Sequence, residues 1–287
     1  MYNEPQSIEQ LKRFILEDIS EIYPRNEAYS ICRIILEHIG FPEMSILRDP
    51  SAPVADEQWS EIKKIVGELH KNKPIQYILG STIFYDLLFK VDENVLIPRP
   101  ETEELVSMIL MEKMPEKARI LDIGTGSGCI AISLAANIPE SQVSALDVDD
   151  GALGIARQNA ALNHVDLDFI QQDILDTGSL VDGGPYDLIV SNPPYVTEEE
   201  QVFMMQNVLK YEPHLALFVP DDDPLKFYRA IAAHAKKLLT EKGTLWFEIN
   251  ESYGNELAEL LLQEGFPGTR LLKDIHGRDR FIKSGRE

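Results

Sequence analysis

The hydrophobic and polar positions of this chain follow two different periods, and the change comes near residue 74. Before it, apolar residues recur three and four positions apart, which is the spacing of one helical face. This pattern predicts helices over 8–19, 28–39 and 56–69. We therefore expect a small all-α domain over residues 1–73.

From Pro74 the apolar positions alternate with polar ones, which is typical of extended chain. We expect a β-hairpin over 74–94 that links two domains. Pro98 and Pro100 then favour an extended segment, because each restricts the residue before it. The acidic residues between 101 and 104 are typical of the first turn of a helix, where the helix dipole favours them.

After residue 95 the pattern indicates a second, larger domain that runs to residue 287. The predicted strands are 118–123, 142–147, 167–172, 186–191 and 243–249. The predicted helices lie near 128–137, 151–162, 225–240 and 252–264. Strands that alternate with helices predict a doubly wound, mostly parallel α/β sheet. Apolar residues around 271 and 282, with a turn between them, predict a closing antiparallel hairpin at the C-terminus.

The charge of the chain narrows the classes of partner. The 48 acidic and 27 basic side chains leave a formal net charge of −21. A polyanion such as duplex DNA is repelled by such a surface, so we expect no stable binding to nucleic acid.

The cysteines and histidines indicate neither a disulfide framework nor a metal site. Cys32 and Cys129 are the two cysteines, and they lie far apart without a CxxC pattern. The 6 histidines show no metal-ligand spacing, so we expect no metal.

The first ten residues lack the basic start and apolar core of a signal peptide, and no stretch reaches the roughly 18 apolar residues of a membrane span. We expect a cytoplasmic protein without a membrane contact.

A glycine-rich loop follows the strand predicted at 118–123. It consists of Gly124, Thr125, Gly126, Ser127 and Gly128. Glycines there permit positive φ and close approach of a ligand to the backbone. A dinucleotide loop has the spacing GxGxxG, with its third glycine where this chain has Cys129. The GxGxG spacing favours S-adenosylmethionine over a dinucleotide, and we expect all five loop residues to contact this cofactor.

Three acidic positions accompany the loop. Asp147 ends the next strand at about the 20-residue spacing that suits hydrogen bonds to a ribose diol. Asp173, followed by Ile174, comes after the third strand, where it can meet the adenine edge. Asp122, just before the loop, suits a cofactor that carries an amino group and no pyrophosphate.

The residues with the clearest chemical character follow the strand at 186–191. They are Asn192, Pro193, Pro194 and Tyr195. The two prolines fix the backbone and remove two N–H donors, while the carbonyl groups remain as acceptors. Asn192 adds a side-chain oxygen, and Tyr195 adds an aromatic face. Such a loop suits a planar NH₂ group, because its two hydrogens need two acceptors and its π system needs a flat surface.

Taken together, these residues resemble class I methyltransferases with an NPPY loop. Five further stretches narrow the resemblance to the release-factor glutamine methyltransferase family. They are PIQYILG at 74–80, FYDLLFKV at 84–91, LIPRPETEELV at 96–106, YEPHLAL at 211–217 and GRDRFI at 277–282. The resemblance implies a seven-stranded methyltransferase sheet, and it covers the chain from the predicted hairpin to the C-terminus.

The resemblance also implies an activity and its partners. A methyl group would pass from S-adenosylmethionine to the amide nitrogen (N5) of the glutamine in the GGQ loop of peptide-chain release factors, leaving S-adenosylhomocysteine. Asn192, Pro193 and Tyr195 would be the catalytic residues, Pro194 would join them in contacting the substrate, and Asn192 would also lie beside the cofactor. The helical N-terminal domain would recognise the release factor.

Three places depart from the family pattern. Asp86 stands where we expect glycine, residues 219–223 lack the usual glycines, and residues 248–254 replace an EIG-type start. They lie outside the glycine and NPPY loops, so we expect them to change local loop shape rather than chemistry.

Two other functions remain compatible with these residues. A nucleic-acid N6-adenine methyltransferase would use the same NPPY loop on a flipped base. A non-catalytic adaptor would bind S-adenosylmethionine without transferring its methyl group. The net charge of −21 disfavours the first alternative, and the complete NPPY loop disfavours the second.

Overall fold

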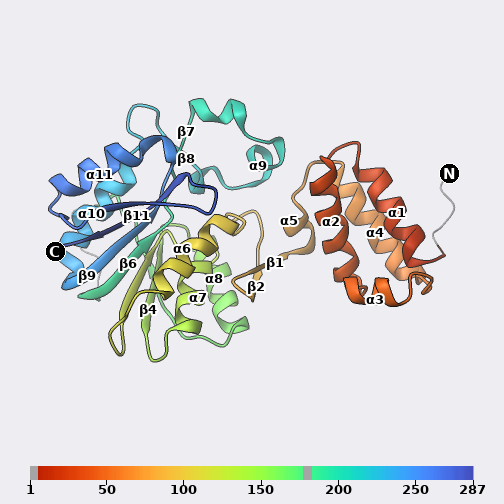
Figure 1. The fold of residues 1–287 in the computed structure, drawn as a ribbon, viewed down its shortest axis with the longest axis horizontal. Helices are drawn as coiled ribbons and strands as arrows, with labels where there is room; N and C mark the ends of the chain where they lie inside the picture. Colours follow the sequence, from red (N-terminus) through yellow and green to blue (C-terminus); the bar gives the residue numbers. More distant parts are fainter. Residues whose placement is uncertain (1–5, 177–182, 287) are drawn as a thin grey trace. The chain divides into compact units, whose positions relative to one another are not determined.

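The computed structural model describes residues 6–176 and 183–286 (Figure 1). The chain divides into two compact units. The first contains the residues up to Gly80 together with 206–211, and the second contains Ser81–Met205 and the chain from Glu212 onward.

The first unit is a small helical bundle. Its main helices are α1 (Ile8–Ile19), α2 (Arg25–His38) and α4 (Asp56–Leu69), as their apolar periodicity predicts. Their apolar faces form one core, in which the rings of Phe14 and Trp59 meet edge to face at 4.8 Å. The short helix α3 (Glu43–Arg48) was not predicted, because it buries no residue and so leaves no periodic signal.

The prediction of extended chain from Pro74 is wrong. Residues Ile75–Leu79 form the helix α5, with Pro74 at its N-cap. Ile75 packs into the core of the helical bundle, and Gly80 ends the helix at a left-handed φ of 71°. The alternating pattern was misleading because a run of five residues is too short to separate the two periods.

The hairpin is therefore shorter than predicted. It consists of β1 (Ser81–Phe84) and β2 (Leu87–Lys90), which pair antiparallel. The two turn residues, Tyr85 and Asp86, have φ values of 48° and 61°. Both are in the left-handed region, which is why glycine is expected at the second position. Aspartate tolerates this region better than most residues, so the departure at Asp86 keeps the turn.

The second unit is built on a seven-stranded sheet with the order β10-β11-β9-β6-β3-β4-β5. The parallel strands are β3 (Arg119–Ile123), β4 (Gln142–Asp147), β5 (Asp168–Gln171), β6 (Tyr186–Ser191) and β9 (Leu239–Glu248). The strands β10 (Arg270–Lys273) and β11 (Asp279–Gly285) are antiparallel and close one edge. The predicted doubly wound sheet with a C-terminal hairpin is confirmed.

Helices cover both faces of this sheet (Figure 1). They are α6 (Pro100–Leu110), α7 (Cys129–Asn137), α8 (Asp150–Leu162), α10 (Lys226–Leu238) and α11 (Gly254–Gln263). Alternate residues of β6 serve the two faces. Leu188 and Val190 pack with α6 and α7, whereas Ile189 packs with α10 and α11. Each such fully buried side chain contributes about 1.5–3 kcal/mol, so the sheet is held from both sides.

The chain between β6 and α10 was not predicted in detail. It contains β7 (Val196–Thr197), which pairs in parallel with β8 (Phe218–Val219), and the helix α9 (Gln206–Tyr211), which clusters with the first unit. In the departing segment 219–223, Asp221 accepts a hydrogen bond from the backbone N–H of Glu199. Its side chains therefore take part in holding this loop, where the family pattern has glycines.

Asp122 fastens the end of β3 to the glycine loop and to α7. Its side chain is fully buried, with 0% exposed. Its Oδ2 accepts hydrogen bonds from Thr125 Oγ1 at 2.6 Å and from the backbone N–H of Ala131 at 3.2 Å. Burial disfavours the charged carboxylate and raises the pKa of Asp122 to about 7.

This raised pKa predicts how the stability of the protein changes with pH. Between the ordinary value of 3.8 and about 7, the folded chain holds a proton on Asp122 that the unfolded chain has lost. The contribution of Asp122 to the free energy of unfolding therefore falls as pH rises across this range. Asp122→Asn removes that dependence, because the amide does not titrate.

Urea unfolding of both proteins at several pH values between 4 and 8 measures the effect. The free energy of the natural protein minus that of Asp122→Asn should fall with rising pH. Taking the difference cancels the titration of the other acidic residues. Parallel curves for the two proteins would contradict the prediction.

Candidate active site

A cavity of about 240 Å³ lies in the second unit, at the carboxyl ends of the parallel strands. It is lined by residues 124–127 of the glycine loop, the end of β4, residues 172–174 and residues 192–194 of the NPPY loop. Gly128 and Tyr195, which the sequence also predicted to contact a ligand, are not among the lining residues. Strand order explains this gathering. The chain passes from β3 to β4 and β5 on one side and returns to β6 on the other, so β3 and β6 flank the switch point where such sheets bind ligands.

The glycine loop has the geometry that its spacing predicts. Gly124, Gly126 and Gly128 have φ values of 72°, 55° and 81°. A Cβ atom at Gly128 would lie 2.9 Å from Ile132 Cδ1 and 3.2 Å from Ala156 Cβ, so this glycine permits close packing of α7 against α8. A Cβ atom at Gly124 or Gly126 would meet nothing within 4 Å. These two positions therefore leave backbone open to a ligand.

Asp147 joins the loop to the end of β4. Its Oδ2 accepts a hydrogen bond from the backbone N–H of Gly126 at 2.8 Å, and its Oδ1 accepts one from the N–H of Asp149 at 3.0 Å. Burial raises the pKa of Asp147, and these hydrogen bonds oppose the rise. Each oxygen retains acceptor capacity, so the carboxylate can also receive two hydroxyl groups from a ligand in the cavity.

The other predicted cofactor residues divide into two groups. Asp173 and Ile174 line the cavity, and Asp173 Oδ1 accepts a hydrogen bond from the backbone N–H of Leu175 at 2.8 Å. Asp122 is fully buried and does not line the cavity. Its carboxyl group accepts hydrogen bonds from Thr125 of the loop and from Ala131 of α7. Its contribution is therefore to the shape of the loop.

The NPPY loop is held in place by the residue that precedes it and by two of its own side chains. Ser191 Oγ donates to the carbonyl of Ile123 at 2.6 Å, which ties the ends of β6 and β3 together. Asn192 Nδ2 donates to Thr102 Oγ1 at 3.2 Å. Tyr195 OH donates to Glu248 Oε1 at 3.1 Å. Asn192, Pro193 and Pro194 all line the cavity.

Sequence reasoning missed four residues at this site, of which Thr102 and Glu248 contact the NPPY loop. Thr102 and Glu248 bind each other as well as the NPPY residues, with 2.7 Å between Thr102 Oγ1 and Glu248 Oε2. Arg99 lines the cavity and is paired through Nη2 with both carboxylate oxygens of the buried Glu212, at 2.6 and 2.7 Å. A usable signal existed for Glu248, because it stands at the carboxyl end of a predicted strand.

The departure at residues 248–254 also touches the NPPY loop. Asn250, which stands where the family pattern has glycine, donates through Nδ2 to the carbonyl of Tyr195 at 3.2 Å and to Glu200 Oε2 at 3.0 Å. Its Oδ1 accepts from the backbone N–H of Ser252 at 3.0 Å. The asparagine therefore adds a contact that glycine could not make.

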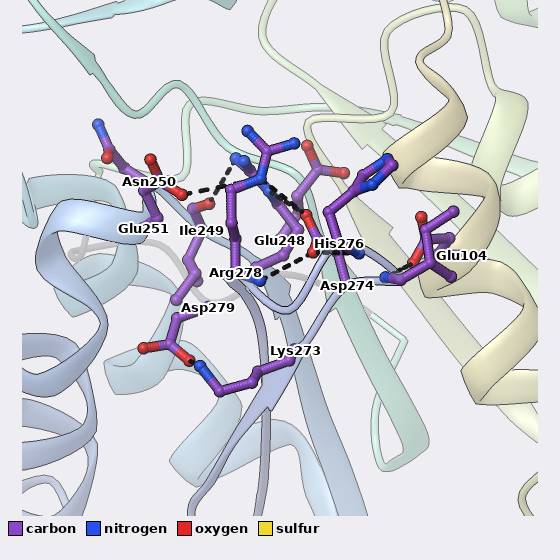
Figure 2. Close-up of polar contacts among 12 residues, drawn as sticks. Glu104, Glu248, Ile249, Asn250, Glu251, Lys273, Asp274, His276, Arg278 and Asp279 are labelled. Carbon is purple, nitrogen blue, oxygen red and sulfur yellow. Dashed lines mark hydrogen bonds and ion pairs between the residues drawn. The ribbon is translucent and has the colours of Figure 1, made fainter.

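Figure 2 shows how Glu248 and Asn250 lie beside the turn between β10 and β11. Asp274 Oδ1 accepts hydrogen bonds from the backbone N–H groups of His276 and Arg278, both at 2.9 Å. These bonds, made to a carboxylate, lower its pKa. Arg280, on β11, has its Nε 3.9 Å from Asp274 Oδ2, and its charge favours the ionised form of Glu248.

Cys129, at the start of α7, also lines the cavity. Burial raises the pKa of its thiol to about 12, so the sulfur is a poor nucleophile at neutral pH. Within residues 6–176 and 183–286, no cluster of histidine, cysteine, aspartate or glutamate is arranged to hold a metal ion. Among the helices of the described chain, none is long and apolar enough to cross a membrane.

Comparisons with known proteins agree with this architecture. The family described as Methyltransferase small domain matches residues 104–215, and the PrmC N-terminal domain matches residues 13–80. A release factor glutamine methyltransferase from Flavobacterium psychrophilum is 47% identical, with 93% of this chain and 95% of the relative covered. One from Bacteroides thetaiotaomicron is 43% identical, with 95% and 98% covered.

A solved structure supports the fold. A methyltransferase from Pyrococcus furiosus superposes with a TM-score of 0.52 at 16% identity, covering 81% of this chain and 99% of the other. The identity to the two bacterial relatives extends over nearly the whole chain, including both units. The chain therefore belongs to the family of release factor glutamine methyltransferases, which are S-adenosylmethionine-dependent enzymes.

Proposed function

We propose that this protein transfers a methyl group from S-adenosylmethionine to the N5 amide nitrogen of the glutamine in the GGQ loop of peptide-chain release factors. One observation carries the proposal. Residues 124–127 of the glycine loop and residues 192–194 of the NPPY loop line the same cavity, after the two strands that flank the switch point. A methyl donor on one side and an amide on the other would thus meet.

The residues of the cavity fit the cofactor. Gly124 and Gly126 leave open space beside the backbone, and Asp147 offers a carboxylate for the ribose diol. Asp173 and Ile174 line the part of the cavity beyond β5, where adenine would lie. Carboxylates suit a cationic ligand, and the one arginine in the described lining, Arg99, is already paired with Glu212. When bound, S-adenosylmethionine supplies an electrophilic methyl group, and S-adenosylhomocysteine is its product.

The NPPY loop would make the amide reactive by holding it. An amide nitrogen is a poor nucleophile because its lone pair is delocalised into the carbonyl. Asn192 Oδ1 and the Pro193 carbonyl would accept its two hydrogens, fix its position and stabilise the positive charge that develops on it, while Tyr195 packs on its plane. Positioning and electrostatics then supply most of the rate. The proton leaves to solvent after methyl transfer, so the chain needs no general base at this step.

The helical unit is proposed to hold the release factor. Its match to the PrmC N-terminal domain over residues 13–80 supports this role, as does the absence of lining residues of the cofactor cavity from the described part of this unit. Its partner is then a soluble translation factor, and the cytoplasm is where both would meet. A methyl-transfer assay on release factor and on DNA distinguishes the proposal from the adenine alternative, and transfer to neither would favour the adaptor.

The cofactor assignment predicts the behaviour of Asp147→Ala. The variant loses the charge-assisted hydrogen bonds to the ribose, which are worth about 1.5–3 kcal/mol, so the Kd for S-adenosylmethionine should rise roughly 10- to 150-fold. Isothermal titration calorimetry measures the change. Asp168→Ala, at the exposed start of β5, is the matched control and should bind normally. Unchanged affinity in a folded Asp147→Ala protein would show that the ribose binds elsewhere.

The acceptor assignment predicts the behaviour of Asn192→Ala. One acceptor is lost, so an amide hydrogen is left unpaired and turnover should fall about 10²- to 10³-fold, by analogy with the loss of one oxyanion-hole donor. The affinity for S-adenosylmethionine should fall less. Mass spectrometry of the release factor detects the product as a gain of about 14 Da on the GGQ glutamine.

The matched control for this variant is Asn163→Ala, the same substitution at the end of α8, where the side chain binds Leu88 and Asn159 carbonyls. It should methylate normally. Full turnover by Asn192→Ala, or methyl transfer to DNA adenine by the natural protein, would overturn the assignment.

The role of the helical unit predicts the result of removing residues 1–80. The shortened protein should bind S-adenosylmethionine with a Kd within about threefold of the full chain, because the cofactor cavity keeps its described lining. It should no longer methylate whole release factor. Calorimetry checks that the remaining unit is folded, and retained methylation at full rate would refute the role.

A further inference from the structure

Glu248 is a buried carboxylate that the proposed chemistry does not use. It stands at the carboxyl end of β9, beside β6 in the sheet, and is 1% exposed. Each of its oxygens accepts one hydroxyl group, Oε2 from Thr102 at 2.7 Å and Oε1 from Tyr195 at 3.1 Å. Burying a carboxylate costs free energy even when it is hydrogen-bonded, so its presence at this strand end needs a reason.

The hydroxyl of Thr102 donates one hydrogen bond and accepts another. A threonine hydroxyl has one proton to donate and lone pairs with which to accept. A carboxylate can only accept, so the proton of Thr102 points to Glu248. The lone pairs of Oγ1 are then left for Asn192, whose Nδ2 lies 3.2 Å away.

This chain of hydrogen bonds sets the orientation of the Asn192 amide. The oxygen and nitrogen ends of an asparagine amide have nearly the same size, so packing alone distinguishes them poorly. With Nδ2 fixed on Thr102, Oδ1 is the end that remains for a ligand. In the reversed orientation Asn192 would offer an NH₂ group to the NH₂ group of the substrate, and two donors cannot bind each other.

We propose that Glu248 is a positioning residue that, through the hydroxyl of Thr102, determines which end of the Asn192 amide faces the glutamine. Its second oxygen holds the ring of Tyr195 through the phenol hydroxyl. The proposal rests on the proposed role of Asn192 as an acceptor. Glu248 does not touch the reacting atoms in this arrangement.

Opposing influences act on the carboxyl of Glu248, and their net effect is a raised pKa. Burial is the largest and raises the pKa, the hydrogen bonds from Thr102 and Tyr195 and the charge of Arg280 oppose the rise, and the charge of Glu101 adds to it. Arg280 is itself paired with Asp274, in the turn between β10 and β11, with 3.9 Å between Arg280 Nε and Asp274 Oδ2. Two donors and one cation thus surround the carboxylate.

Thr102→Val tests the connection to Asn192, because valine keeps the shape of threonine and removes its hydroxyl. We expect kcat to fall about 10- to 100-fold, the effect of leaving one buried donor unpaired. The KM for release factor and the Kd for S-adenosylmethionine should stay within about threefold. Thr102→Ser restores the hydroxyl and should recover most of the lost kcat.

Glu248→Gln tests the origin of the orientation without touching Thr102. A carboxamide supplies one acceptor and one donor to two hydroxyls that both donate, so one of them must reverse. The variant should show the same loss of kcat with little change in KM. Thr269→Val is the matched control, because Thr269 Oγ1 also makes two hydrogen bonds, to Phe266 and Ser284, and Ser284 pairs with Leu245 of β9 rather than with Glu248. It should keep its kcat even if its melting temperature falls.

The alternative is that Thr102 and Glu248 serve stability alone. In that case both variants would lower the melting temperature and leave kcat unchanged in the folded fraction, which would overturn the proposal. Parallel loss of cofactor affinity and kcat in Thr102→Val would also overturn it, since Thr102 would then act on the cofactor. A normal kcat in Glu248→Gln would remove Glu248 from the chain of hydrogen bonds.

A double-mutant cycle separates this inference from the proposed function. Thr102→Val should reduce turnover little in an Asn192→Ala background, because Thr102 acts through Asn192. Additive losses would refute the inference while leaving Asn192 in place. Full turnover in Asn192→Ala alone would refute the acceptor role itself, and a large loss in Asn192→Ala with none in Thr102→Val would refute only the positioning role.

Discussion

The parallel pairing of β6 with β3 on one side and β9 on the other is the constraint on which the rest of the site depends. It brings three strand ends to one edge of the sheet, so that Gly124, Asn192 and Glu248 follow or end neighbouring strands. The hydrogen bond from Ser191 Oγ to the Ile123 carbonyl fixes the separation of the two loops at their origin. The glycine loop and the NPPY loop are thus brought together by backbone pairing.

Two buried carboxylates also hold the loops in place, through side-chain hydrogen bonds. Asp122 below the glycine loop and Glu248 below the NPPY loop are both fully or almost fully buried, and each accepts a hydroxyl from a threonine, Thr125 or Thr102. In both cases burial raises the pKa of the acid, so each group lowers the stability of the fold at neutral pH. The same low-dielectric setting makes their hydrogen bonds directional and strong. The two buried acids therefore lower the free energy of unfolding at neutral pH, while their hydrogen bonds hold the glycine and NPPY loops in a defined geometry.

The sequence determined the sheet and both loops because their signals are local. Apolar runs mark β3, β4 and β6. The glycines of the one loop all lie within residues 124–128, and the prolines of the other are adjacent. The supporting contacts are not local. Thr102 contacts Glu248 and Asn192, which lie 146 and 90 residues away in the sequence. No hydrophobic periodicity predicts contacts over such separations. The helix α5 was missed because Ile75–Leu79 is too short for its apolar pattern to identify a helix. Packing of Ile75 into the core of the helical unit determines its conformation more than the local pattern does.

The acceptor geometry proposed for the NPPY loop would explain reactivity better than specificity. Two carbonyl oxygens and an aromatic face would receive the NH₂ group of a glutamine amide or of adenine equally well. Discrimination must then come from the rest of the protein. A formal charge of −21 disfavours the approach of a phosphate backbone at long range. A neutral or basic peptide loop meets no such barrier. Under the proposed function, the acidic composition would disfavour nucleic acid, and contacts outside the NPPY loop would select the amide that is methylated.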